Sequence, residues 1–339
     1  MKILVTGSAG FIGGYLVEEL LNQGHTVVGL DNYSKYGKVE KSYDKNPNYE
    51  FHQGDAKDAE LLKKLLVDSD HLVAGAAKIG GITYFHEFAY DLLAENERIT
   101  ASTFDAAIHA FKNYKLKKIT LLSSSMVFES TNVFPTPETA VKTSPPPEST
   151  YGFQKLATEY FAKGAWEQYK LPYTIVRPFN CVGTGEARAK TGKEIKSGNV
   201  ELAMSHVVPD LVQKVLKGQY PLHIFGEGTQ IRHYTYAGDL AKGIVLTIFS
   251  PKATNEDLNL STDKSTTVLE LAELIWRKIN PNKTFRYVSD KPFEHDVQKR
   301  VPDTTKAKKI LGFEAKTTLE QMLDEVIPWI KKQIELGTI

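Results

Sequence analysis

The chain has very little cysteine and almost no excess of charge. Its 339 residues contain one cysteine, Cys181, so no disulfide bond can form within the chain and no cysteine zinc site is available. The 42 Lys and Arg side chains nearly balance the 41 Asp and Glu side chains, and the formal net charge is +1. This balance gives no support to binding of nucleic acid or of a membrane surface.

Long apolar runs and metal-ligand spacings are missing as well. No apolar run approaches the length that crosses a membrane, and the nine histidines form no metal-spaced cluster, so we expect no metal. The first apolar segment begins at residue 2, from which we expect no signal or transit peptide and a cytoplasmic protein. With 41% hydrophobic residues, the chain can build one large domain or two smaller ones.

Short apolar segments alternate with segments of helical spacing through the first half of the chain. This alternation predicts an α/β fold with a doubly wound parallel sheet (Rossmann), followed by a smaller C-terminal α/β substrate-binding domain. We expect residues 1–178 to form the cofactor domain, joined by a segment near 225–260, and residues 179–339 to form mainly the substrate domain. The expected strands lie at 2–6, 26–30, 50–55, 71–77, 118–122 and 173–177.

A glycine-rich turn follows the first expected strand. Gly7, Gly10 and Gly13 stand between the apolar run Lys2–Thr6 and a segment of helical spacing. In such a strand-to-helix turn the first glycine permits the tight turn, the second allows close approach of the backbone, and the third lets helix and strand pack closely. The N–H groups of the helix N-terminus can then hold a pyrophosphate. The position of the turn therefore predicts a dinucleotide site.

Asp31 ends the second expected strand, about twenty residues further on. A carboxylate there accepts hydrogen bonds from a ribose 2′-hydroxyl and repels a 2′-phosphate. Asn32 follows it, and no Arg stands in the next three positions. The sequence therefore predicts NAD rather than NADP.

A serine and a Tyr-x-x-x-Lys pattern supply candidate catalytic residues. Ser124 lies just after the fifth expected strand, and Tyr151 and Lys155 lie four residues apart at the start of an expected helix. Residues at this spacing project from one helix face, and a nearby ammonium favours phenolate and lowers the pKa of a tyrosine. We therefore expect Tyr151 to act as a proton acceptor or donor.

Together, these motifs resemble the extended short-chain dehydrogenase/reductase family, in particular its NAD-dependent nucleotide-sugar epimerase/dehydratase group, of which UDP-glucose 4-epimerase is an example. The resemblance extends over nearly the whole chain. Further matching segments are Asp31-Asn32, Gly54-Asp55, Ala76-Ala77-Lys78, Arg177-Pro178-Phe179-Asn180, Gly226-x-Gly228-x-x-x-Arg232 and Arg300-x-x-Asp303.

The resemblance implies roles for residues beyond the glycine turn and the Tyr–Lys pair. It implies that Asp55 contacts adenine, that Asn96 lies near the nicotinamide end and that Phe179 packs on the nicotinamide. It implies further cofactor contacts from Phe11, Ile12, Asn32, Ala56, Ala76, Ala77 and Lys78. Asn180, Arg232 and Arg300 would hold the diphosphate of a nucleotide sugar, since a guanidinium binds phosphate oxygens in a fork. Further substrate contacts are expected from Ser125, Met126, Asn199, His206 and Asp303.

The residues after the catalytic serine bear on the reaction. Dehydratases and decarboxylases of this family generally carry an acid there, whereas this chain has Ser125 and Met126, which cannot shuttle a proton from a sugar carbon. This argues against elimination and decarboxylation. The expected function is epimerisation, at C4, through a transient keto sugar with tightly bound and recycled NAD. The expected partner is a nucleotide-diphosphate sugar, and the family resemblance implies a homodimer.

Two alternatives stay open. Residues 76–82 and 205–209 resemble GDP-fucose synthase, a 3,5-epimerase/reductase in which the histidine matching His206 donates a proton. Met126 replaces the partner cysteine of that enzyme, and Asp31 disfavours its NADPH. The other alternative is a non-catalytic NAD-binding sensor or scaffold, which would be expected to lose the Tyr or the Lys.

Overall fold

The fold is built on a sheet of seven parallel strands in the order β13-β6-β5-β4-β1-β2-β3. The structure is a computed structural model and describes residues 1–80, 87–186, 195–202, 206–292 and 297–339. From β1 the strands β2 and β3 follow on one side and β4, β5, β6 and β13 on the other, as in doubly wound nucleotide-binding sheets. The strands are β1 (Lys2–Thr6), β2 (Thr26–Asp31), β3 (Tyr49–Gln53), β4 (His71–Ala74), β5 (Lys118–Leu122), β6 (Tyr173–Pro178) and β13 (Glu256–Leu260).

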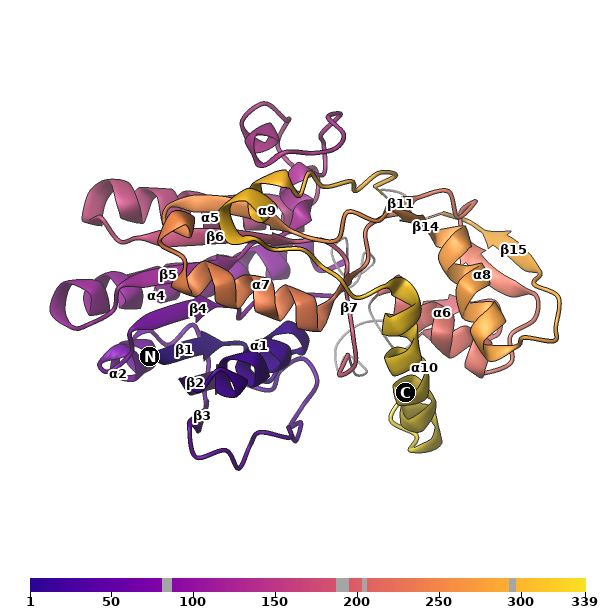
Figure 1. Cartoon of the computed structure of the whole chain (residues 1–339), viewed down its shortest axis with the longest axis horizontal. Coiled ribbons are helices and arrows are strands. Elements are labelled where there is room, and N and C mark those ends of the chain that lie inside the picture. Colours follow the sequence, from indigo (N-terminus) through magenta and orange to yellow (C-terminus); the bar gives the residue numbers. More distant parts are fainter. Residues whose placement is uncertain (81–86, 187–194, 203–205, 293–296) are drawn as a thin grey trace.

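Helices cover both faces of this sheet (Figure 1). Each central strand is a nearly continuous apolar run, as expected for strands buried on both faces. On one face pack α1 (Phe11–Asn22), α7 (Ala237–Phe249) and α9 (Thr305–Leu311), and on the other α2 (Ala59–Leu66), α4 (Ala89–Asn113) and α5 (Thr150–Tyr169). The predicted parallel α/β sheet and its first six strands are therefore confirmed.

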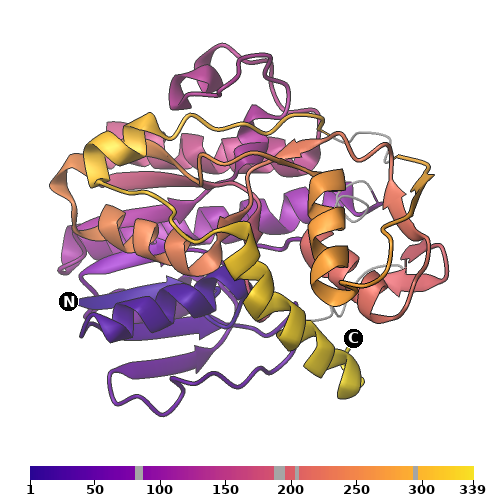
Figure 2. The ribbon, with the colours of Figure 1, turned by 45° about the vertical axis from the view of Figure 1, so that its right-hand side comes forward.

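A smaller apolar core lies beside the sheet and holds the helices α6 (Val207–Leu216), α8 (Val268–Ile279) and α10 (Leu319–Glu335) (Figures 1 and 2). Its helices are strongly amphipathic, and two of them begin with a capping box, Thr267 with Glu270 and Thr318 with Gln321. The remaining strands are β7 (Cys181–Val182), β8 (Ile195–Ser197), β9 (Val200–Leu202), β10 (Leu222–Phe225), β11 (Ile231–Arg232), β12 (Thr235–Tyr236), β14 (Thr266–Thr267) and β15 (Tyr287–Asp290), with short helices η1 (Ser125–Phe128), η2 (Glu138–Lys142) and η3 (Pro251–Ala253).

The chain crosses more than once between the sheet and the smaller core. After β6 it leaves the sheet for β8 and β9, and it returns through α7 and β13, which pairs with the edge strand β6. Helix α7 packs against the glycine-bearing helix α1. Because α7 and β13 belong to the large sheet while α6 and α8 do not, a single cut in the sequence does not separate the two halves.

Candidate active site

The glycine turn leaves no room for side chains. Gly7 has φ +75°, a conformation that other residues rarely adopt, and a Cβ on Gly13 would lie 2.0 Å from the Gly7 carbonyl oxygen. Helix α1 begins directly after Gly10, and in the described part of the chain no side chain caps its N-terminus. A cradle of bare backbone at a helix N-terminus fits the pyrophosphate of NAD.

The polar side chains of Asp31, Asn32 and Asp55 lie near this turn, where β2 and β3 end. The Asp31 carboxylate accepts hydrogen bonds from the N–H groups of Ala9, at 3.1 Å, and Tyr33, at 2.8 Å. Burial raises its pKa, and these bonds and the charge of Lys41 oppose that shift. Asn32 donates a 3.3 Å hydrogen bond to Asp55. The side chains of Asp31 and Asp55 are suited to the adenosine part of the cofactor, which stays the role predicted for them.

Ser124 and Tyr151 meet at the carboxyl end of β5. Ser124 caps η1, where its Oγ accepts a hydrogen bond from Met126 N at 3.2 Å, and its side chain is also hydrogen-bonded to Tyr151. Tyr151 is buried in the first turn of α5, and burial raises the pKa of its phenol, opposed by the Ser124 hydrogen bond and the positive charge of Arg300. The sequence pattern predicted a lowered pKa, which is wrong for this structure because desolvation is the larger effect.

Lys155 lies beside the ring of Tyr151, as the four-residue spacing predicts. Its Nζ is 5.9 Å from the ring centroid and donates a 2.9 Å hydrogen bond to the Leu122 carbonyl. Burial lowers the pKa of Lys155 to about 8, and the charge of Glu159 acts in the other direction.

One large cleft joins these groups. It has a volume of about 2150 Å³, well above the size of an ordinary small-ligand pocket, and is lined from both the sheet and the smaller core. Such a volume can hold a dinucleotide and a nucleotide sugar together. The predicted site residues that line it are Gly7, Gly10, Phe11, Ile12, Gly13, Asp31, Asn32, Asp55, Ala56, Ala76, Ala77, Lys78, Ser124, Ser125, Met126, Tyr151, Lys155, Asn180, His206, Arg232 and Arg300.

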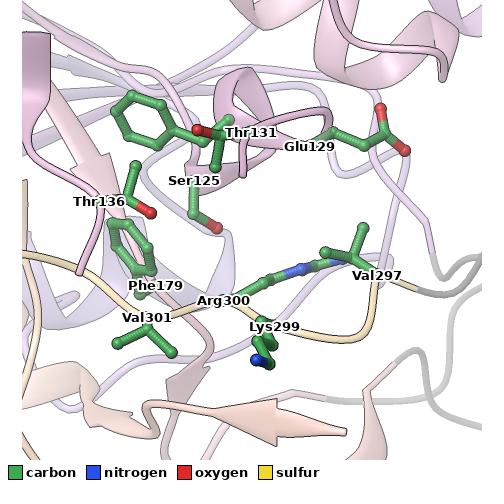
Figure 3. A pocket seen from close by; sticks show the side chains of 10 residues that line it. Ser125, Glu129, Thr131, Thr136, Phe179, Val297, Lys299, Arg300 and Val301 are labelled. Carbon is green, nitrogen blue, oxygen red and sulfur yellow. The ribbon is translucent and has the colours of Figure 1, made fainter. Parts of the chain in front are cut away.

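Four predicted site residues lie elsewhere. Asn96 is buried behind the cleft, and its amide both accepts from Lys78 N, at 2.7 Å, and donates to Lys78 O, at 2.8 Å. Phe179 stacks on Phe128 and lines a separate cavity of about 10 Å³ next to Ser125 and Arg300 (Figure 3). Exposed Asn199 accepts a hydrogen bond from Gln219, and the Asp303 carboxylate accepts one from Thr305 N, before α9.

These placements change how the four residues can act. Asn96 fixes the backbone of a cleft-lining segment rather than facing the cleft itself, because both halves of its amide are used on Lys78. Phe179 packs with Val127, Phe128 and Ala140 and lines the same small cavity as Ser125. The side chains of Asn199 and Asp303 form their hydrogen bonds outside the cleft, and the substrate contacts expected from them stay predictions.

The two candidate phosphate-binding arginines approach the cleft from the smaller core. Arg232 is buried and donates hydrogen bonds to the carbonyls of Ile231, at 2.9 Å, and Gln298, at 3.4 Å. The backbone N–H of Arg300 donates to Ile231 O at 3.1 Å, which holds the two arginine-bearing segments side by side. Both arginines line the cleft.

His206 precedes α6 at the same cleft and hydrogen-bonds through Nδ1 to the buried Glu186. The neighbouring residues 81–82 and 205 of the GDP-fucose-synthase-like segments lie outside the described residues. Cys181 also lines the cleft, and burial raises the pKa of its thiol, as expected for an unreactive cysteine.

Sequence reasoning missed a contact chain that joins the glycine helix to α10. Tyr15, on α1, exchanges hydrogen bonds with Thr184 and packs edge-on against Tyr236. The Tyr236 hydroxyl donates a 2.8 Å hydrogen bond to Glu325 of α10. No local pattern predicts this chain, because Tyr15 and Thr184 are 169 residues apart and Tyr236 and Glu325 are 89 residues apart.

Two further properties concern the part of the chain that the structure describes. Within it, no cluster of three or more His, Cys, Asp or Glu side chains is arranged to hold a metal ion. None of the helices described is both long and apolar enough to cross a membrane.

The model of the NAD dependent epimerase/dehydratase family matches residues 3–261. The chain is similar to UDP-glucose 4-epimerase from Thermotoga maritima, solved with UDP-glucose, at 30% identity and a TM-score of 0.82 over 98% of this chain and 100% of that one. It is similar to UDP-glucuronic acid 4-epimerase from Bacillus cereus, solved with UDP-glucuronic acid and NAD, at 25% identity and a TM-score of 0.81 over 98% and 99%. It is also 27% identical to UDP-N-acetyl-alpha-D-glucosaminuronate decarboxylase from Bacillus cytotoxicus, over 98% of each chain.

These similarities confirm the predicted nucleotide-sugar epimerase group and NAD as its cofactor. They also agree with the doubly wound sheet described above. Nothing in them favours the 3,5-epimerase/reductase or the non-catalytic alternative. Since the family model spans about three quarters of the sequence, the chain belongs to the NAD dependent epimerase/dehydratase family.

Proposed function

We propose that this protein is a UDP-sugar 4-epimerase that uses tightly bound, recycled NAD. The observation that carries the proposal is the meeting of Ser124, Tyr151 and Lys155 in the same cleft as the glycine turn. Similar chains that are solved with UDP-sugars support the nucleotide and the carbon. The cytoplasmic location stays a prediction.

Tyr151 is proposed to accept the proton of the sugar 4-hydroxyl, and Ser124 to hydrogen-bond the oxygen as it becomes a carbonyl. Burial alone keeps the phenol of Tyr151 protonated, so its basicity depends on the cations around it, Lys155 and Arg300. The chemistry that NAD supplies when bound is reversible acceptance of a hydride by a cationic ring, and this charge also favours phenolate. Tyr151 would then return the proton to the sugar oxygen when that oxygen becomes a hydroxyl again.

The guanidinium groups of Arg232 and Arg300 are proposed to hold the diphosphate of the substrate. Both arginines line the cleft that also holds the glycine turn, and a guanidinium binds two phosphate oxygens at once. Holding the diphosphate rather than the sugar leaves the keto sugar able to rotate. Rotation is what an epimerase needs, because the hydride must return to the other face. Asn180 and His206, which line the same cleft, are proposed to add polar contacts to the substrate.

The residues after Ser124 favour epimerisation over decarboxylation within this family. Ser125 and Met126 are both buried and line the cleft, and neither is ionisable near neutral pH. Met126 packs with Leu92 and Tyr151 in a small apolar cluster. Because Ser125 and Met126 stand after Ser124, no acidic side chain is present at these positions to move a proton from the sugar ring.

A panel of nucleotide sugars incubated in D₂O tests this function. The purified protein, without added cofactor, is given UDP-glucose, UDP-glucuronic acid, UDP-N-acetylglucosamine and matching CDP-, GDP- and dTDP-sugars, and products are identified by NMR. We expect a UDP-sugar to convert to its C4 epimer with no deuterium on the ring, because the hydride goes out and back. Deuterium at C3 or C5, or release of CO₂, would replace the proposal with one of the other reactions.

We also propose a homodimer that forms through α4 and α5. Phe153, Tyr160 and Phe161 project from one side of α5 and are 48%, 65% and 38% exposed, and Tyr90 on α4 is 77% exposed. A cluster of large exposed apolar side chains on two packed helices is typical of an interface. Sedimentation of the wild type against Tyr160→Glu tests it: we expect a dimer that dissociates in the variant.

A further inference from the structure

The two segments that carry Ser124 and Tyr151 are tied together by a residue outside the cleft. Glu129 follows η1, and its Oε2 accepts hydrogen bonds from both the backbone N–H of Ser149, at 2.9 Å, and the Ser149 hydroxyl, at 2.7 Å. Ser149 is buried and is the N-cap of α5, where its Oγ accepts from Gly152 N at 3.0 Å. The Glu129–Ser149 contact thus joins the serine turn to the helix of Tyr151.

This contact closes a long loop at its base. Glu129 and Ser149 are 20 residues apart, and the neighbouring hydroxyl of Ser130 donates a 3.0 Å hydrogen bond to Pro146 O. The loop between them carries the proline-rich stretch, which has little apolar core of its own. The loop is also tied to the sheet farther out, because Glu138 accepts a hydrogen bond from Asn259 N and the Asn259 amide donates to Thr136 O. Of these ties, the Glu129–Ser149 contact is the one that lies at the start of α5.

The first turn of α5 is packed directly on the serine turn. A Cβ on Gly152 would lie 2.7 Å from Met126 O and 3.0 Å from Glu129 Oε2, so the helix and the turn already touch through backbone atoms. The first turn of α5 contains no acidic residue, and the Glu129 carboxylate lies at that helix N-terminus, where a negative charge is favourable. Both effects hold α5 in one position against η1.

We propose that Glu129 is a positioning residue for Tyr151, holding the N-cap of α5 against the serine turn and so fixing the hydrogen bond between Ser124 and Tyr151. Figure 3 shows the Glu129 carboxylate directed away from the Ser125 hydroxyl, so it acts through Ser149 and not on the reacting atoms. The inference rests on the proposed function, in which Tyr151 is the proton acceptor.

The pKa of Tyr151 gives a readout that needs no substrate. The Ser124 hydrogen bond lowers the pKa of Tyr151. If the first turn of α5 is held less firmly, this bond weakens and the pKa of Tyr151 rises. NAD-loaded protein labelled with ¹³C at tyrosine Cζ is titrated by NMR, and the signal of Tyr151 is assigned from its loss in Tyr151→Phe. We expect Glu129→Ala to raise the titration midpoint of Tyr151. Glu129→Gln, which keeps an acceptor for Ser149, is expected to restore part of the difference.

Glu148 offers a matched control. It is exposed, directly precedes Ser149 and makes no side-chain hydrogen bond or ion pair within the described residues. Glu148→Ala therefore removes a carboxylate near the same helix end and leaves the Glu129–Ser149 contact in place. We expect this variant to titrate and turn over like the wild type. A change in Glu148→Ala as large as that in Glu129→Ala would overturn the proposal, because charge alone would then explain the effect.

Turnover gives the second readout. For a UDP-sugar that the protein epimerises, Glu129→Ala is expected to lower kcat about 10- to 100-fold, the effect of a misplaced catalytic group, with KM changed less than about twofold. In a Tyr151→Phe background the same change is expected to add nothing, because both act on one group. An unchanged Tyr151 titration, or a loss that adds fully to that of Tyr151→Phe, would overturn the inference. Absence of epimerisation on every sugar would refute the proposed function alone, and the titration would still decide the role of Glu129.

Discussion

Replacing Gly13 by alanine tests the glycine cradle at its tightest point. The added Cβ would lie 2.0 Å from Gly7 O and 2.9 Å from Gly7 C, where ordinary van der Waals contact begins at 3.4 Å. Both atoms are backbone and cannot rotate away, so the turn must open. Overpacking of this kind typically costs about 1–3 kcal/mol. Because the displaced backbone is the part that faces the pyrophosphate, we expect NAD to bind about 10- to 100-fold more weakly.

The adjacent Gly14 supplies the control. A Cβ there would meet Lys41 Nζ at 3.0 Å, the free end of a flexible side chain that can move aside. Gly14→Ala is therefore expected to keep its NAD. The assay is the NAD content of the purified proteins, followed by calorimetric titration of the stripped forms. Full NAD content and wild-type affinity in Gly13→Ala would refute the assignment of this turn as the pyrophosphate site.

Three further changes test other parts of the site and the core. Tyr151→Phe keeps the ring but removes the proton acceptor, so NMR-monitored turnover should fall about 10²- to 10⁴-fold with little change in KM. Asp31→Ala should narrow the preference for NAD over NADP in calorimetric titrations, and equal affinity of the wild type for both would contradict the role of Asp31. Lys118 donates a hydrogen bond to Thr247 O in the core, and burial lowers its pKa to about 8 from 10.5. The unfolded chain then holds more protons between these pH values, so the wild type should gain about 1–2 kcal/mol of unfolding free energy relative to Lys118→Met from pH 7.5 to 9.5, measured by urea denaturation.

The parts of the site that depend on neighbouring residues could be predicted from the sequence. Gly7 and Gly13 are six residues apart, and the strand and helix around them show in the apolar pattern. Tyr151 and Lys155 share a helix face because of their spacing alone. Ser124 and Asp31 follow strand ends, and in a parallel sheet those ends lie at one edge, so the gathering of these groups follows from the topology.

Burial and long-range pairing could not be predicted in this way. The pKa of Tyr151 was expected to be lowered because the pattern shows the cation four residues away, but not how far the phenol is removed from water. Asn96 was placed in the site by resemblance, and nothing in the sequence indicated that its amide is used entirely on the backbone of Lys78. The error in the pKa of Tyr151 arises because local spacing gives the direction of a side chain and not its surroundings.

The same limit explains why the supports of the site were missed while its reactive groups were found. Ser124 and Tyr151 stand in short motifs, but their relative position is set by Glu129 and Ser149, which belong to no motif and meet across a loop. A hydrogen bond tolerates only a few tenths of an ångström, whereas a motif specifies only which element a residue occupies. Precision at a catalytic centre therefore depends on pairs that only the folded chain brings together. Substitutions at such pairs are expected to alter turnover without altering any residue that a sequence motif identifies.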